Sequence, residues 1–389
     1  MKKFIAIATG VLLAASVCVF AACNNSADVT EYHYQEVDLT NESQKKALVD
    51  EIAEKVNLFN LFGDTTAKNY SFGFASEAGV KLEVSAGAQN VALPNLDNAV
   101  DLEAALSFET NSSAKAKYSS SGIALEGESS IAASLTASDE LYGLLAYYTK
   151  LDADSVTAIK AAVSNINYSF KEYIDNDYVY LEYPKELLDL IPDSLLQGVS
   201  LPEGGKIKIA LDSYGSGNNT SYYALPEAST YASAPQFDPM KELVKAYAAQ
   251  ALDFLYECDV KIETSSDDGF AIKLSANSAA IFKLVGQLGS ENNDVLATIE
   301  EYASFKSLDV VVYFSVDKSG VFKQLSVGVE ADADVTVNLA NLIGEGMPTI
   351  TGSAKISLNL SLKKYTGKVK VPSTDNSYVD VSALLNSAE

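Results

Sequence analysis

The chain has 389 residues, of which 48% are hydrophobic and 10% aromatic. This composition supports one or two buried cores and excludes an intrinsically disordered chain. The formal net charge is -24, every cation is a lysine, and the sequence contains neither Arg nor Trp. Such acidity argues against nucleic acid as a partner. Without guanidinium groups, a site specific for phosphate also lacks its usual bidentate donor.

The N-terminus has the three parts of an export signal: two lysines, an uncharged apolar run at residues 4–19, and small residues before Cys23. The run is shorter than the roughly 20 residues of a transmembrane helix. Phe20-Ala21-Ala22-Cys23 resembles the lipobox of bacterial lipoproteins, with Phe20 where that family usually has Leu. The resemblance implies cleavage of residues 1–22, diacylglycerol on Cys23, and attachment to the extracytoplasmic face of the cell membrane. The alternative is an ordinary signal peptide cut near Ala22, with a released product.

The other cysteines and the single histidine offer little chemistry. Cys18 leaves with the signal, so Cys258 has no internal partner for a disulfide, and we expect it to be a buried, inert thiol. Residues 23–41 are polar and predict a tether between the lipid and the folded body. His33 lies in this tether, where it lacks the partners that a catalytic or metal site needs.

Residues 42–211 are predicted to form a first unit of helix and antiparallel sheet. Helical spacing over 42–62, with Asn41 and Gln44 placed as a capping box, predicts an amphipathic helix. This helix is expected to cover a sheet, the alternative being a membrane surface. Alternation then predicts strands as far as Ser134, beginning with a hairpin at 69–86 that turns near Ala78-Gly79. Two helices over 140–165, a hairpin over 166–183 and a short helix over 185–196 follow.

Residues 212–237 predict a loop or linker, and 238–389 a second unit of the same kind. Asp238-Pro239 is a typical helix start. The hairpin that follows, at 259–275, turns at Asp267-Asp268-Gly269. Because helix and hairpin occur in both halves, we infer a duplicated architecture, in one large or two similar domains. Further expected elements are helices at 279–288 and 294–302 and strands at 308–316, 325–339 and 354–362. The expected apolar face of the helix after Asp238 consists of Leu243, Val244, Tyr247, Ala251, Phe254, Leu255 and Cys258.

The order of these segments resembles the LolA/LppX-like lipoprotein family. The resemblance lies in the lipobox, tether, helix and long alternating strands, the turn at Val316–Lys323, and the closing Tyr365 to Pro372 segment. It implies an α+β fold in which a long, curved, half-barrel-like antiparallel sheet, closed by amphipathic helices, surrounds an apolar cavity for lipid. The same alternation also fits a solid core.

No catalytic, cofactor or metal signature is found, and we expect that the protein is not an enzyme. The acid pairs Glu300-Glu301, Asp267-Asp268 and Asp332 with Asp334 follow from the abundance of acids alone. Asp175-Asn176-Asp177 is a candidate calcium loop by its acidic residues, but it lacks the Gly and the distal Glu of such a loop.

The favoured hypothesis is a lipoprotein that binds or carries lipid or another hydrophobic ligand. The alternative is a structural or surface-interaction lipoprotein without a cavity, making protein or carbohydrate contacts through exposed tyrosines. Four tyrosines in the predicted loop favour this alternative: Tyr214, Tyr222, Tyr223 and Tyr231. The ligand itself does not follow from the sequence.

Overall fold

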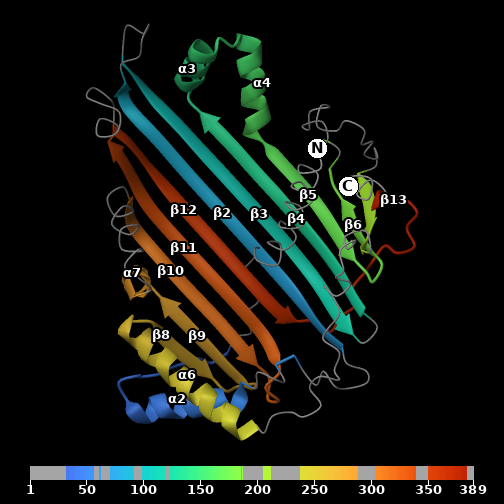
Figure 1. The fold of residues 1–389 in the computed structure, drawn as a ribbon. Coiled ribbons are helices and arrows are strands. Elements are labelled where there is room, and N and C mark those ends of the chain that lie inside the picture. The colour runs from blue at the N-terminus through green and yellow to red at the C-terminus, as the bar shows by residue number, and fades with distance from the viewer. Residues whose placement is uncertain are drawn as a thin grey trace.

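The computed structural model is mostly β, with 13 strands hydrogen-bonded into one sheet and five helices beside it in the part of the chain that it describes (Figure 1). The predicted α+β class is confirmed. The structure describes residues 32–56, 61–62, 71–91, 99–119, 122–184, 186, 205–211, 237–287, 303–338 and 349–382.

The strands differ widely in length, and the longest lie in the middle of the sheet. The strands are β1 Gln35–Glu36, β2 Ser71–Val91, β3 Val100–Ser119, β4 Gly122–Ala137, β5 Ile166–Ile174, β6 Tyr178–Glu182, β7 Lys206–Ala210, β8 Lys261–Ser265, β9 Phe270–Ala276, β10 Ala303–Val316, β11 Phe322–Asn338, β12 Thr349–Lys364 and β13 Val379–Asp380. The helices are α2 Glu42–Lys55, α3 Asp139–Thr149, α4 Ala153–Ser164, α6 Phe237–Glu257 and α7 Ser278–Gln287.

The order across the sheet is β1-β8-β9-β10-β11-β12-β2-β3-β4-β5-β6-β7-β13. Neighbours are antiparallel, except that β13 pairs with β7 in parallel, so the sheet is mixed. The C-terminal strand β12 lies beside β2, so strands from both predicted units form one continuous sheet (Figure 1). The predicted linker at 212–237 lies outside the described residues.

The alternation of the sequence becomes the two faces of this sheet, because successive side chains of a strand point to opposite sides. In the β11/β12 register, Leu325 lies opposite Leu362, Val327 opposite Leu360 and Val329 opposite Leu358. The same ladder pairs Asp332 with Lys355 on the other face. One face is therefore apolar and the other polar, as the spacing predicted.

Helix α2 begins at the predicted cap. The Asn41 side chain accepts hydrogen bonds from the backbone N–H groups of Ser43 and Gln44, and Gln44 Oε1 accepts one from the backbone of Asp38 at 2.9 Å. In a standard capping box, the Gln44 side chain would accept from the backbone N–H of the cap residue, Asn41. Here it accepts instead from Asp38, three residues before the cap. The helix ends at Lys55, earlier than the predicted 62. Packing of α2 on α6 and β8 forms a cluster that includes Leu48, Leu252 and Ile262.

The predicted hairpin at 69–86 is wrong. Residues 71–91 form the single strand β2, which passes straight through Ala78-Gly79. Pairing with β12 is unbroken from Phe74 to Gly87, because the alternation simply continues through the small residues. The inferred duplication thus loses one of its two hairpins, and the two helices that supported it, α2 and α6, pack together at one end of the sheet.

The predicted tether, 23–41, is in part folded onto the body. Gln35 and Glu36 form β1, which pairs with β8, and Leu39 is buried in the cluster under α2. The polar composition of the tether did not predict its docking on the body, because the docking needs only two strand residues and one apolar side chain. Residues 23–31 lie outside the described residues.

Other expected elements are confirmed with small shifts at their ends. Helices α3 and α4 are separated at Asp152, whose side chain caps α4, and β5/β6 and β8/β9 are hairpins at the predicted turns. The expected apolar face of α6 is partly wrong: Leu252 is its most buried residue, while Leu243 and Tyr247 are exposed. The predicted helices at 185–196 and 294–302 fall outside the described residues, apart from Glu186.

Candidate functional site

The apolar face extends across the whole width of the sheet. The pairing registers place alternate residues of β8 to β12 and of β2 to β7 on this side. Its large side chains on the central strands are Val310, Val312, Val327, Val329, Ile356, Leu358, Leu360, Val80, Leu82, Val84, Leu106, Phe108, Ile131 and Leu135. A soluble protein normally covers such a surface or uses it for binding.

Among the helices that the structure describes, α2, α6 and α7 cover one side of this face. Ile262, Phe270 and Val316, on β8 to β10, lie under α2 and α6, and Leu274 packs against a cluster that includes α7. Figure 1 shows α2, α6 and α7 gathered beside β8, β9 and β10, and α3 and α4 at the far end of β3 and β4. Among the described helices, none lies along the middle of the long central strands in this view.

The exposure of the apolar side chains on β3 and β4 differs between the two ends of these strands. At the end that carries the β10–β11 turn, which we name the closed end, Ala78 and Ala116 are fully buried and Leu125 nearly so. At the opposite end, the open end, Leu106 is 40% exposed and Leu135 38% exposed. Those two residues form a cross-strand pair, so β3 and β4 present adjoining apolar side chains to solvent at the open end, whereas Ala88 of the neighbouring strand β2 is 6% exposed there.

A strip of small residues crosses the closed end on the apolar face. Gly127 of β4 lies opposite Ala114 of β3 and Glu172 of β5. In the β2/β3 ladder, the pairs Gly73 with Lys117 and Ala88 with Leu102 share one register, which places Ser76 beside Ala114. The strip therefore runs from Ser76 through Ala114 and Gly127 to Glu172.

Two polar groups in this strip lack the partners that burial normally requires. The Ser76 hydroxyl is buried and makes no hydrogen bond within the described part of the chain. Burial raises the pKa of Glu172 to about 7, and no charge or hydrogen bond from the described residues contributes to that shift. Across the described strands, the register places no other Asp or Glu on the apolar face.

The polar face carries ladders of opposite charges. The Lys306 ammonium lies 2.7 Å from Asp334 and 3.9 Å from Asp332, and Lys355 lies 3.8 Å from Asp332. Each carboxylate of the Asp332/Asp334 pair thus faces a lysine of a neighbouring strand, and such pairs of opposite charge link the strands.

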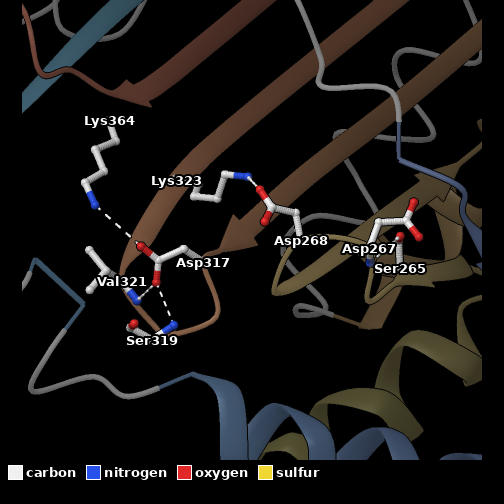
Figure 2. Close-up of polar contacts among 8 residues, drawn as sticks. All are labelled: Ser265, Asp267, Asp268, Asp317, Ser319, Val321, Lys323 and Lys364. Carbon is white, nitrogen blue, oxygen red and sulfur yellow. Dashed lines mark hydrogen bonds and ion pairs between the residues drawn. The ribbon is translucent and has the colours of Figure 1, made fainter.

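The hairpin turns at the closed end are held by side chains that cross from one turn to the next (Figure 2). Asp317 Oδ1 accepts hydrogen bonds from the backbone of Ser319 and Val321, and its other oxygen lies 3.5 Å from the Lys364 ammonium. Lys323 bonds to Asp268 of the β8–β9 turn at 2.8 Å. These contacts satisfy the acids internally and fix the turns.

The segment Asp175-Asn176-Asp177, considered as a calcium loop from its sequence, is a hairpin turn of the same kind. Asp175 accepts from the backbone of Asp177 and Tyr178 and from the Tyr180 hydroxyl, so its oxygens serve the β5–β6 hairpin. Within the described ranges, no group of three or more His, Cys, Asp or Glu is placed to hold a metal ion.

His33 and Cys258 have local partners. The backbone N–H of His33 donates to Asp267 at 2.9 Å and its ring lies 3.0 Å from the same oxygen, which attaches the N-terminal segment to the β8–β9 turn. Cys258 is fully buried, with Sγ 3.1 Å from Gln287 Oε1, and burial raises its thiol pKa. The predicted burial of this thiol is therefore confirmed.

Two predicted features lie outside the described residues: Cys23 with its lipobox, and the loop that contains Tyr214, Tyr222, Tyr223 and Tyr231. Among the helices that the structure describes, none is both long and apolar enough to cross a membrane. No family model and no curated protein matches the chain in sequence.

Sequence reasoning missed Glu172, although a signal was present. Ile166, Tyr168 and Phe170 alternate along the strand, and the next position of the series is an acid followed by Ile174. A single charge that interrupts an apolar series is visible without a structure. Its isolation on the face becomes visible only when the registers of all neighbouring strands are known.

Proposed function

We propose that the protein is a membrane-anchored, extracytoplasmic lipoprotein that binds lipid or another hydrophobic ligand on the apolar face of its sheet. The observation that carries the proposal is the exposure of large side chains on the apolar face: Leu106 and Leu135 at the open end and Ile356 in the middle of β12 are 38–42% exposed. Contiguous exposed apolar surface of this kind is typical of binding sites. The finer picture of a half-barrel that curves around the ligand belongs to this proposal.

The anchor in this proposal is diacylglycerol on Cys23, supported by the lipobox-like residues 20–23. Two acyl chains supply about 0.8 kcal/mol per buried methylene, enough for stable attachment. The test is mass spectrometry of the N-terminal peptide from the full chain and from Cys23→Ser. We expect a diacylglyceryl mass on Cys23 and loss of membrane attachment in the variant. An unmodified, released wild-type product would favour the ordinary signal peptide.

Ligand binding is tested by native mass spectrometry and lipid extraction on the form that begins after Cys23, purified from a membrane-containing host. We expect co-purified lipid at stoichiometric level. Ile356→Glu should remove it, because a charge on the apolar face opposes burial of hydrocarbon. Thr351→Glu is the matched control, since Thr351 is exposed on the other face of the same strand. An apo mass that takes up no added lipid would exclude the carrier.

A second candidate is a surface-interaction lipoprotein that does not bind a hydrophobic ligand. It is favoured by the outer side of α6, where Leu243 is 46% and Tyr247 65% exposed one helical turn apart. Such residues supply contact area for a protein partner. Retention of a partner by wild type and by Ile356→Glu, with loss in Tyr247→Ala, would favour this candidate.

A further inference from the structure

Glu172 occupies an unusual position on the apolar face of the sheet. It lies between Gly127 of β4 and Leu181 of β6, with Phe170 and Ile174 as its neighbours along β5. Gly127 has no side chain, so the carboxyl borders the two small residues Gly127 and Ala114. A side chain that could have been apolar is instead an acid, at the edge of this strip of small residues.

The Glu172 carboxyl has no charged or hydrogen-bonding partner among the residues that the structure describes. It is part-buried, and desolvation alone accounts for its raised pKa, so no described residue provides a cation or a hydrogen-bond donor. Burying an acid without a partner disfavours its charged form. A ligand that carries a donor or a positive charge would supply the missing partner.

The far end of the strip gives an independent indication. Residue Ser76 is only 2% exposed, and its hydroxyl has no hydrogen-bond partner in the described part of the chain. Ser76 and Glu172 are separated by three strand spacings, about 14 Å. Between them lie only Ala114 and Gly127. The strip thus combines a small-residue floor with two unsatisfied polar groups.

We propose that this strip is the headgroup site of the ligand-binding face and that it takes an amphiphile with a positively charged amine, the ammonium bound by Glu172. The apolar chain then lies over the central strands towards Leu106 and Leu135 at the open end. The inference rests on the proposed ligand-binding function and adds to it the chemical class of the ligand. A cation at the carboxylate restores the charged form that burial disfavours.

The test compares three probes of equal chain length, namely decylammonium, decanol and decanoate, by calorimetric titration at pH 7.4 and 0.15 M salt. Decanol is the neutral reference, because the strongly acidic protein attracts any cation. We expect decylammonium to bind at least about tenfold more tightly than decanol, as befits a charge-assisted hydrogen bond. In Glu172→Gln the two affinities should agree within about twofold.

Glu128→Gln is the matched control: it removes the same charge from an exposed position on β4, adjacent in sequence to Gly127 but on the polar face. It should retain the preference for the amine. Gly127→Val fills the strip, where a Cβ meets only ordinary contacts, and should weaken all three probes.

The outcomes separate the two proposals. If all three probes bind wild type equally, or if Glu172→Gln retains the preference for the amine, the headgroup site is refuted and the ligand-binding face stands. If no probe binds at all, the ligand-binding function itself is refuted, and the headgroup site with it.

Discussion

The helix-covered side of the sheet and its open central strands carry the same sequence pattern and meet different environments. On β8 and β9, Ile262 and Phe270 are each 2% exposed beneath α2 and α6. On β12 and β3, Ile356 and Leu106 follow the same alternation and are 42% and 40% exposed. Alternation therefore identifies an apolar face but does not determine what covers it, because cover comes from segments remote in sequence.

The largest contrast should appear when a buried residue of the covered side is truncated. Ile262→Ala is expected to lower the free energy of unfolding by about 3 to 4 kcal/mol, the range for Ile truncations that leave a cavity. Urea denaturation followed by circular dichroism measures the change. A loss below about 1 kcal/mol would mean that the α2/α6 cluster contributes little to the sheet.

Glu172 should make stability fall with rising pH. Its folded pKa of about 7 exceeds the ordinary glutamate value of 4.5, so between these pH values the folded state retains a proton that the unfolded state has lost. Stability is thus lost from pH 4.5 to 7, and at pH 8 Glu172→Gln should be more stable than wild type by at most about 3 kcal/mol.

Denaturation midpoints at pH 4 and pH 8 check this pH effect. The gain in Glu172→Gln should be present at pH 8 and absent at pH 4. The same pair of measurements on Glu128→Gln, on the exposed polar face, should show no such gain. A gain of equal size at both pH values would contradict the assigned titration.

A smaller effect is expected at the cap of α2. Asn41→Ala removes the acceptor of two backbone N–H groups and should destabilise the protein by about 1 kcal/mol. Ser43→Ala is its control, because Ser43 contributes only a backbone N–H to the cap. Equal denaturation midpoints for the two variants would show that the cap does not contribute to stability.

The smallest change in stability is expected on the open strands. Ile356→Ala should alter the free energy of unfolding by less than about 1 kcal/mol, since much of the side chain is already in water. It should nevertheless weaken uptake of a fluorescent fatty-acid probe. A destabilisation as large as that of Ile262→Ala would show that the two sides of the sheet are equally covered.

The sequence alone determined much of the local structure. Helix-start chemistry located α2 through Asn41, and turn residues located the hairpins at Asp175 and Asp267, because caps and tight turns depend on a few adjacent residues. The strict alternation from Leu325 to Val335 determined the two faces of β11, since the side chains of a strand alternate. The proposal that Cys23 carries the lipid anchor likewise rests on residues 20–23 alone.

Only the tertiary structure decided the arrangements that depend on distant segments. It placed β2 beside β12, docked β1 on β8, and made one continuous strand of the segment where small residues had indicated a turn. It also isolated Glu172, because the surroundings of a side chain on a sheet come mainly from neighbouring strands. The registers that bring those strands together are set by packing across the whole fold, and no single stretch of sequence contains them.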